Sequence, residues 1–178
     1  MLRLVTPLSQ DQINNLKVLD NITISGRILT GRDVVLPKLV RIIENNGFKD
    51  LKLSLEGSVI FHTAVSPAGI GPTSSNKVDI ESSIPALSKA GVKIHLGKGS
   101  LSRATVQALK EHGSLFAITP PVSALFGAKV RKQRAIAFLE EGMEALHELE
   151  VVDFPAIIAI AHGQSIFDQG GDRHEYLI

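Results

Sequence analysis

The sequence predicts an α/β domain with a mixed sheet that contains a parallel strand–helix–strand unit. In this unit an apolar strand at 92–96 is followed by a helix that Ser102 caps and that runs to His112, and by a second apolar strand at 115–118. Strands joined by a helix of this length lie parallel, through a right-handed crossover. The later apolar run IIAIA at 157–161 has the length and composition of a buried strand. We expect antiparallel strands in that last third of the chain.

The first third predicts two strands and a helix. Residues 2–5 form a short strand, residues 10–16 a helical turn, and residues 21–29 (NITISGRIL) a half-buried strand, because apolar and polar residues alternate there. Asp33 is expected to cap the next helix, and Gly47 to end it. The apolar positions of this helix lie three or four residues apart, at Leu36, Leu39, Val40 and Ile43.

The central stretch at 60–79 reads IFHTAVSPAGIGPTSSNKVD. After a strand at 59–61, it predicts a break at Ser66-Pro67, a glycine-rich loop over 69–75, and a helix with a capping box formed by Asn76 and Asp79. Pro85 is expected to kink that helix or to restart it at 82–83. A loop of this kind at a helix N-terminus presents backbone N–H groups to an anion. The alternative is an ordinary loop with ordinary cap residues.

In the last third of the chain the sequence leaves the secondary structure of two segments undecided. Residues 130–138 fit a strand or a helix, and residues 143–154 begin with helix-forming residues but turn β-like at 149–154. Gly163 offers a turn into 165–167. We expect one domain over 1–178, with a frayed polar tail at 168–178.

Composition excludes several classes of protein. The chain has 178 residues, 44% of them hydrophobic, a net charge of +1 and no tryptophan, which argues against nucleic acid or an acidic membrane surface as a partner. The absence of cysteine excludes a disulfide scaffold and an iron–sulfur cluster held by this chain's thiolates. The N-terminus lacks the apolar core of a signal peptide, so we expect a cytoplasmic protein without membrane contact.

Cationic and hydroxyl residues stand at the predicted turns. Arg32 and Lys98 each follow an apolar strand and are flanked by glycine, while Lys77 follows the hydroxyl cluster at 73–75. Arginine binds a carboxylate through two parallel hydrogen bonds and lysine acts as a point charge, so together these residues could hold a small dicarboxylate. The alternative is that each is an ordinary exposed loop charge.

The six histidines lack the spacing of metal ligands. We therefore expect His62 to be structural, with its hydrogen bonds satisfied, and His147 and His162 to be structural as well.

Four segments together resemble a known family. TGRD at 30–33, FHTAVSPAGIGPTSS at 61–75, GVKIHLGKG at 91–99 and GMEALHELEVVDFPAIIAI at 142–160 are similar to the β region of class I fumarate hydratases, and also to the β subunit of L-tartrate dehydratase. The resemblance implies a swivelling β/β/α three-layer domain. It also implies a partner α subunit whose three cysteines hold a 4Fe-4S cluster, so that no metal ligand comes from this chain.

The same resemblance implies roles for individual residues. Arg32 corresponds to a carboxylate-binding arginine, Lys98 to the lysine of the GKG turn, and Thr73 to a threonine assigned to base chemistry. Gly71, Ser74 and Lys77 complete the expected substrate-binding set. The chain departs from the family pattern at Ser74, which replaces a threonine, and at Lys77, which replaces an arginine. A third departure is Leu36, where a histidine is common.

The implied activity is reversible hydration of fumarate to L-malate at a site shared with the α subunit. One alternative is a related hydro-lyase acting on L-tartrate or another hydroxy diacid. A second is a carboxylate-binding or regulatory subunit without catalysis. We expect Arg32 and Lys98 to converge on one pocket, and a hetero-oligomer, with a homodimer through this chain as a further option.

Overall fold

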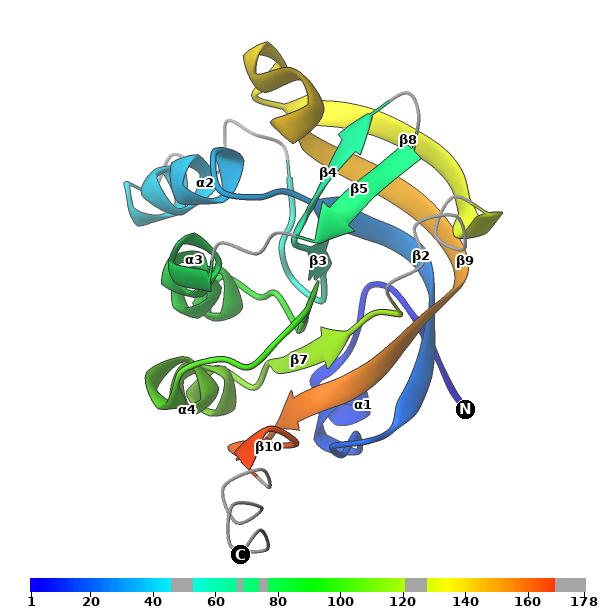
Figure 1. Cartoon of the computed structure of the whole chain (residues 1–178), viewed down its shortest axis with the longest axis vertical. Coiled ribbons are helices and arrows are strands. Elements are labelled where there is room, and N and C mark those ends of the chain that lie inside the picture. Colours follow the sequence, from blue (N-terminus) through cyan, green and yellow to red (C-terminus); the bar gives the residue numbers. More distant parts are fainter. Residues whose placement is uncertain (46–52, 67–68, 74–76, 121–127, 169–178) are drawn as a thin grey trace, which may run out of the picture.

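The structure is a computed structural model that describes residues 1–45, 53–66, 69–73, 77–120 and 128–168 (Figure 1). For Thr73 and Lys77 it describes the backbone only. The elements in chain order are β1 (Leu2–Val5), α1 (Gln10–Asn14), β2 (Asn21–Thr30), α2 (Val35–Glu44), β3 (Val59–Phe61), β4 (Thr63–Ser66), β5 (Gly69–Thr73), α3 (Lys77–Lys89), β6 (Ile94–Gly97), α4 (Arg103–Glu111), β7 (Leu115–Ile118), β8 (Val130–Ala137), the 3₁₀ helix η2 (Leu139–Glu144), β9 (Leu146–Ala161) and β10 (Gln164–Ser165).

The main sheet is mixed, and part of it closes on itself. Strands β1, β2, β3, β6 and β7 pair in parallel in that order, whereas β9 runs antiparallel to β7, β8 and β10. Strand β9 also pairs with β2, which joins β2, β3, β6, β7 and β9 into a ring. The predicted mixed sheet with a parallel unit is therefore confirmed.

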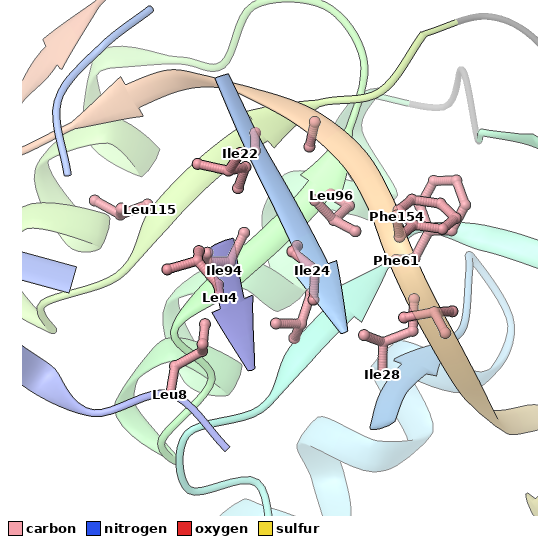
Figure 2. Packing of buried hydrophobic residues seen from close by; sticks show 14 of the residues in the cluster. Leu4, Leu8, Ile22, Ile24, Ile28, Phe61, Ile94, Leu96, Leu115 and Phe154 are labelled. Carbon is pink, nitrogen blue, oxygen red and sulfur yellow. The ribbon is translucent and has the colours of Figure 1, made fainter. Parts of the chain in front are cut away.

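The ring encloses the largest apolar cluster. Alternate residues of β3, β6 and β7 point into it, among them Phe61, Ile94 and Leu115, and they meet Ile24 of β2 and Phe154 of β9 (Figure 2). The rings of Phe61 and Phe154 pack edge to face, with centroids 5.5 Å apart. The inside of the ring is therefore the core of the domain.

Three helices cover the outer face of the parallel strands. Helices α2, α3 and α4 stack along one side of the strands in Figure 1, and α3 contacts both of its neighbours. The residues that alternate with the ring core, such as Ile60 and Phe116, pack against this helical layer. Because both faces of β3 and β7 are buried, their sequences are continuous apolar runs rather than alternating ones.

Most of the predicted elements are confirmed. Strands at 2–5, 59–61 and 115–118 begin and end where predicted, and Ser102 caps α4 through a bond from the Thr105 amide. The C-terminal strands pair antiparallel, and the open segment at 130–138 is a strand. The predicted stop at Gly47, the capping box at Asn76 and the polar tail from 169 lie outside the described residues.

The predicted glycine-rich loop at 69–75 is wrong for its first part. Residues Gly69–Thr73 form strand β5, which pairs antiparallel with β4 in a two-stranded sheet of its own. Glycine and proline hide the strand in the sequence, but an edge strand tolerates proline because its free side needs no donor.

Two smaller predictions need correction, and two open points are resolved. Asp33 does not cap α2, whose N-cap is Val34 without a side-chain bond. Of the two options at Pro85 a restart is excluded, because α3 is one helix, and the open segment at 143–154 is a strand from Leu146, where β9 begins. The burial of strand β2 does not alternate, because Asn21 is exposed while residues 22–24 and 28–30 form two continuous buried runs.

No helix in the described part of the chain is long and apolar enough to cross a membrane. The cytoplasmic location stays a prediction.

Candidate functional site

The C-terminal ends of the parallel strands form one edge of the sheet. Thr30 of β2 pairs with Phe61 of β3, and Phe61 pairs with Leu96 of β6, so the three residues form a row. Neighbouring strands lie about 4.8 Å apart, which puts the backbones of Thr30 and Leu96 roughly 10 Å apart. Arg32 stands two residues after Thr30 in the chain, and Lys98 stands two residues after Leu96. Ligands of α/β proteins commonly bind beyond this edge of the sheet.

The β4–β5 hairpin stands on the same edge, between the two cationic turns. It begins one residue after His62, above β3 in Figure 1. Thr73, the last residue of β5, pairs with Thr63, the first residue of β4, so the chain returns to the edge at Thr73. The Thr63 hydroxyl donates to the Gly71 carbonyl at 2.7 Å and fixes the hairpin there.

The backbone thus brings most of the predicted site residues to one edge. Arg32, Gly71, Thr73 and Lys98 lie on or next to it, and α3 begins at Lys77 shortly beyond Thr73. Ser74 lies outside the described residues. That these side chains share one ligand stays a prediction.

The glycines beside the two cations have physical reasons to be there. A Cβ on Gly31 would lie 2.8 Å from Cδ2 of Leu36, because α2 starts directly against the turn. Gly99 has a φ of +75°, a conformation that residues with a side chain rarely adopt. The buried Leu36 therefore belongs to the packing of this turn.

Arg32 and Lys98 differ in their electrostatic surroundings. The Arg32 guanidinium lies 3.4 Å from Oδ2 of Asp33 through Nη2, and 3.6 Å from Oε1 of Glu144 through Nε. Lys98 is exposed and pairs with no carboxylate among the described residues. The charge of Arg32 is therefore compensated within the chain, whereas that of Lys98 is available to a ligand.

Sequence reasoning missed Glu144 as a neighbour of Arg32. Glu144 ends η2, and Lys38 of α2 holds the same segment through ion pairs with Glu140 and Glu141. These carboxylates raise the pKa of Lys38, and the hydrogen bond that Lys38 donates to Glu141 has the largest effect. The signal that could have found Glu144 is its place in the GMEA segment, which the family resemblance already included.

A buried histidine pair lies directly behind the edge. His62 Nε2 is 3.2 Å from His95 Nδ1, and His95 Nε2 is 2.9 Å from the Ser88 hydroxyl. Burial lowers the pKa of His62 to about 4, against an opposing effect of the Asp33 charge. Burial and the neighbouring His62 lower the pKa of His95 well below its usual range. Both rings are therefore neutral at pH 7.

The prediction that His62 has all its hydrogen bonds satisfied is wrong. Its Nδ1 is buried and has no partner among the described residues. His147 and His162, by contrast, each lie within hydrogen-bond distance of a backbone carbonyl, at 2.8 Å and 2.9 Å.

A surface hollow of about 660 Å³ lies away from this edge. Its lining includes Ser58, which precedes β3 at the other end of the strand, together with the exposed Arg27 and Arg134. The hollow is open to solvent and contains none of the predicted site residues, so we give more weight to the strand edge. No group of three or more potential metal ligands occurs among the described residues.

The fold defines a mixed α/β domain with cationic turns at the carboxyl edge of its parallel strands. The family model described as "Fumarase C-terminus" matches residues 1–170. The chain therefore belongs to the fumarase C-terminus family.

Three relatives illustrate the range of this family. The chain is 31% identical over 177 residues to the anaerobic class I fumarate hydratase of Escherichia coli. The aligned region covers 94% of this chain and 30% of that protein. It is 28% identical to fumarate hydratase 2 of Leishmania major, over 93% of this chain and 29% of that protein. It is 26% identical to the L(+)-tartrate dehydratase subunit beta of Escherichia coli, over 92% of this chain and 85% of that subunit. The chain thus spans about a third of the fumarate hydratases and most of the tartrate dehydratase subunit.

Proposed function

We propose that this chain is the β part of an iron–sulfur hydro-lyase that reversibly hydrates fumarate to L-malate. It would supply carboxylate-binding and proton-transfer residues to a site shared with an α subunit. The observation that carries the proposal is the common edge of the Arg32 turn, the Thr73 end of the hairpin and the Lys98 turn, in a chain of the fumarase C-terminus family. We also propose that the domain is of the swivelling β/β/α three-layer type.

The cations would bind the substrate and stabilise the charge that develops during the reaction. Lys98 and Arg32, with Lys77, would hold the two carboxylates, and Gly71 and Ser74 would complete the substrate-binding set. Removal of the proton next to a carboxylate places negative charge on that group, and fixed cations stabilise this charge without reorganisation. A threonine hydroxyl is a weak base, so Thr73 would need activation by an acidic residue of the partner.

The residues of this chain do not fit a 4Fe-4S cluster. The sequence contains no cysteine, and biological clusters rest mainly on thiolates. The cluster of the proposed complex would therefore be held by the cysteines of the α subunit. This chain would contribute the carboxylate-binding half of the site.

Two other functions have specific support. Dehydration of L-tartrate or another hydroxy diacid is favoured by the match over 85% of a tartrate dehydratase β subunit. A regulatory subunit that binds carboxylates without turnover is favoured by the compensation of Arg32 by Asp33 and Glu144.

The deciding experiment is to co-purify the α partner and assay the complex without oxygen on fumarate, L-malate and L-tartrate. Turnover of fumarate and malate supports the first function, and preference for tartrate supports the second. Diacid binding without turnover supports the third. The isolated chain should fold, contain no iron and be inactive. If the isolated chain hydrated fumarate, the shared-site proposal would be wrong.

A further inference from the structure

The buried hydrogen-bonded series Ser88–His95–His62 ends in an atom that has no partner among the described residues. His62 has no exposed surface and occupies the position between β3 and β4, at the carboxyl edge. Its backbone amide donates to the Leu96 carbonyl at 2.9 Å, which fixes the residue next to β6. The ring is held by His95 through Nε2, while Nδ1 meets no polar atom in the described part of the chain.

The hydrogen-bond inventory of the rings allows two arrangements. In one, Ser88 donates to His95, His95 donates to His62 Nε2, and His62 carries its proton on Nδ1. In the other, each bond is reversed and Nδ1 is a bare acceptor. Either way Nδ1 is a buried polar atom that finds no partner in the part of the chain that the structure describes, and folded proteins rarely leave such an atom uncompensated.

A ligand bound at the carboxyl edge could supply the missing partner, because His62 stands at the end of β3 on this edge. His62 follows β3, which lies between the strands that lead to Arg32 and Lys98. A ligand attracted by cations at this edge is an anion, and an ionised carboxylate only accepts hydrogen bonds. The first arrangement, with the proton on Nδ1, fits such a ligand.

We propose that His62 Nδ1–H donates a hydrogen bond to a carboxylate of the bound diacid, and that His95 and Ser88 fix the ring and its tautomer for this contact. The proposal rests on the proposed function, because it takes a dicarboxylate as the ligand. It makes His62 a ligand-binding residue. His95 and Ser88 are positioning residues that act through it.

The first test needs no substitution. The full chain is labelled with ¹⁵N-histidine, and long-range ¹H–¹⁵N spectra are recorded at neutral pH during a titration with succinate, a diacid that cannot be hydrated. We expect His62 to be neutral with its proton on Nδ1, and its Nδ1 resonance to shift with saturation. A proton on Nε2, or His62 resonances that ignore succinate, would overturn the proposal.

The second test uses variants in the reconstituted complex. An asparagine side chain places its amide near the position of Nδ1, whereas glutamine reaches the position of Nε2. His62→Gln should therefore raise KM for the diacid roughly ten- to a hundred-fold, the range for a lost bond to a charged group, with a smaller change in His62→Asn. His112→Gln, at the end of α4, is the matched control and should leave KM unchanged.

The outcomes separate this inference from the proposed function. An active complex whose KM is the same in His62→Gln overturns the inference and leaves the hydro-lyase intact. An inactive complex in which succinate still shifts the His62 resonance overturns the hydro-lyase and supports the carboxylate contact.

Discussion

Acidification from about pH 6.5 to about pH 4 should cost this domain about 3 kcal/mol of folding stability through His62 alone. Burial brings the pKa of His62 down from 6.5 to about 4. A difference of one in pKa corresponds to about 1.4 kcal/mol, which gives about 3 kcal/mol for this shift. The pKa of His95 is lowered for the same reason, so its contribution has the same sign.

The sign follows from proton binding. Between about pH 6.5 and about pH 4 the unfolded chain carries a proton on His62 and the folded chain does not, so the unfolded state binds more protons. Stability therefore rises with pH in this window. The folding stability associated with a neutral His62 is fully present above pH 6.5 and is lost as the pH falls toward 4.

The assay is urea unfolding across this pH range for the wild type and for His62→Leu/His95→Met. Carboxylates titrate in both proteins, so the difference between their pH profiles isolates the two imidazoles. We expect the double variant to lose at least about 3 kcal/mol less than the wild type on acidification, and His112→Gln to behave like the wild type. Equal acid losses in the double variant and the wild type would refute the argument.

Four further predictions concern the site and the core. In the complex, Thr73→Ala should lower kcat roughly a hundred- to ten-thousand-fold if the hydroxyl takes part in proton transfer, and near-normal kcat would limit it to a structural role. Arg32→Ala should lower kcat and also raise KM, because it removes a charge-assisted contact with the substrate. Glu144→Gln removes a competing charge but keeps an acceptor for Arg32, so succinate should bind several-fold more tightly by calorimetry. Weaker succinate binding by Glu144→Gln would contradict this reasoning. Phe154→Ala should cost about 3–5 kcal/mol in urea unfolding, because the fully buried ring packs against Phe61, and a loss below about 1 kcal/mol would contradict the packing argument.

The elements that could be predicted from the sequence are those fixed by local rules. Strand β7 is a short apolar run between a helix stop and a turn, and α4 begins at a serine that caps it. Such signals involve neighbours in the chain, so they survive in any tertiary context. The carboxyl edge was likewise predictable, because parallel strands joined by helices put their ends together.

The elements that could not be predicted depend on distant partners. The first part of β9 contains good helix formers, yet it is a strand because β2 and β8 pair with it on both sides. Strand β5 consists of Gly-Ile-Gly-Pro-Thr and is held by its pairing with β4. Intrinsic propensity is a weak preference that such pairing overrides.

The same distinction applies to the site. The motif positions of Arg32 and Lys98 were visible in the sequence, whereas the pairing of Arg32 with Glu144 and of His62 with His95 depends on the tertiary structure. No local pattern distinguishes a histidine with two partners from one that lacks a partner on Nδ1.

The surroundings of Arg32 bear on how it could serve a dicarboxylate. Asp33 and Glu144 contact Nη2 and Nε at 3.4 and 3.6 Å, and no residue in the described part of the chain binds Nη1. The two carboxylates can therefore orient the guanidinium while Nη1 still offers donors to a ligand. Their charges, however, exceed that of Arg32, so in the proposed site the net attraction for a dianion would come from Lys98 and Lys77. Arg32 would then give the ligand its orientation, while the lysines and the Nδ1 donor of His62 hold it at the edge.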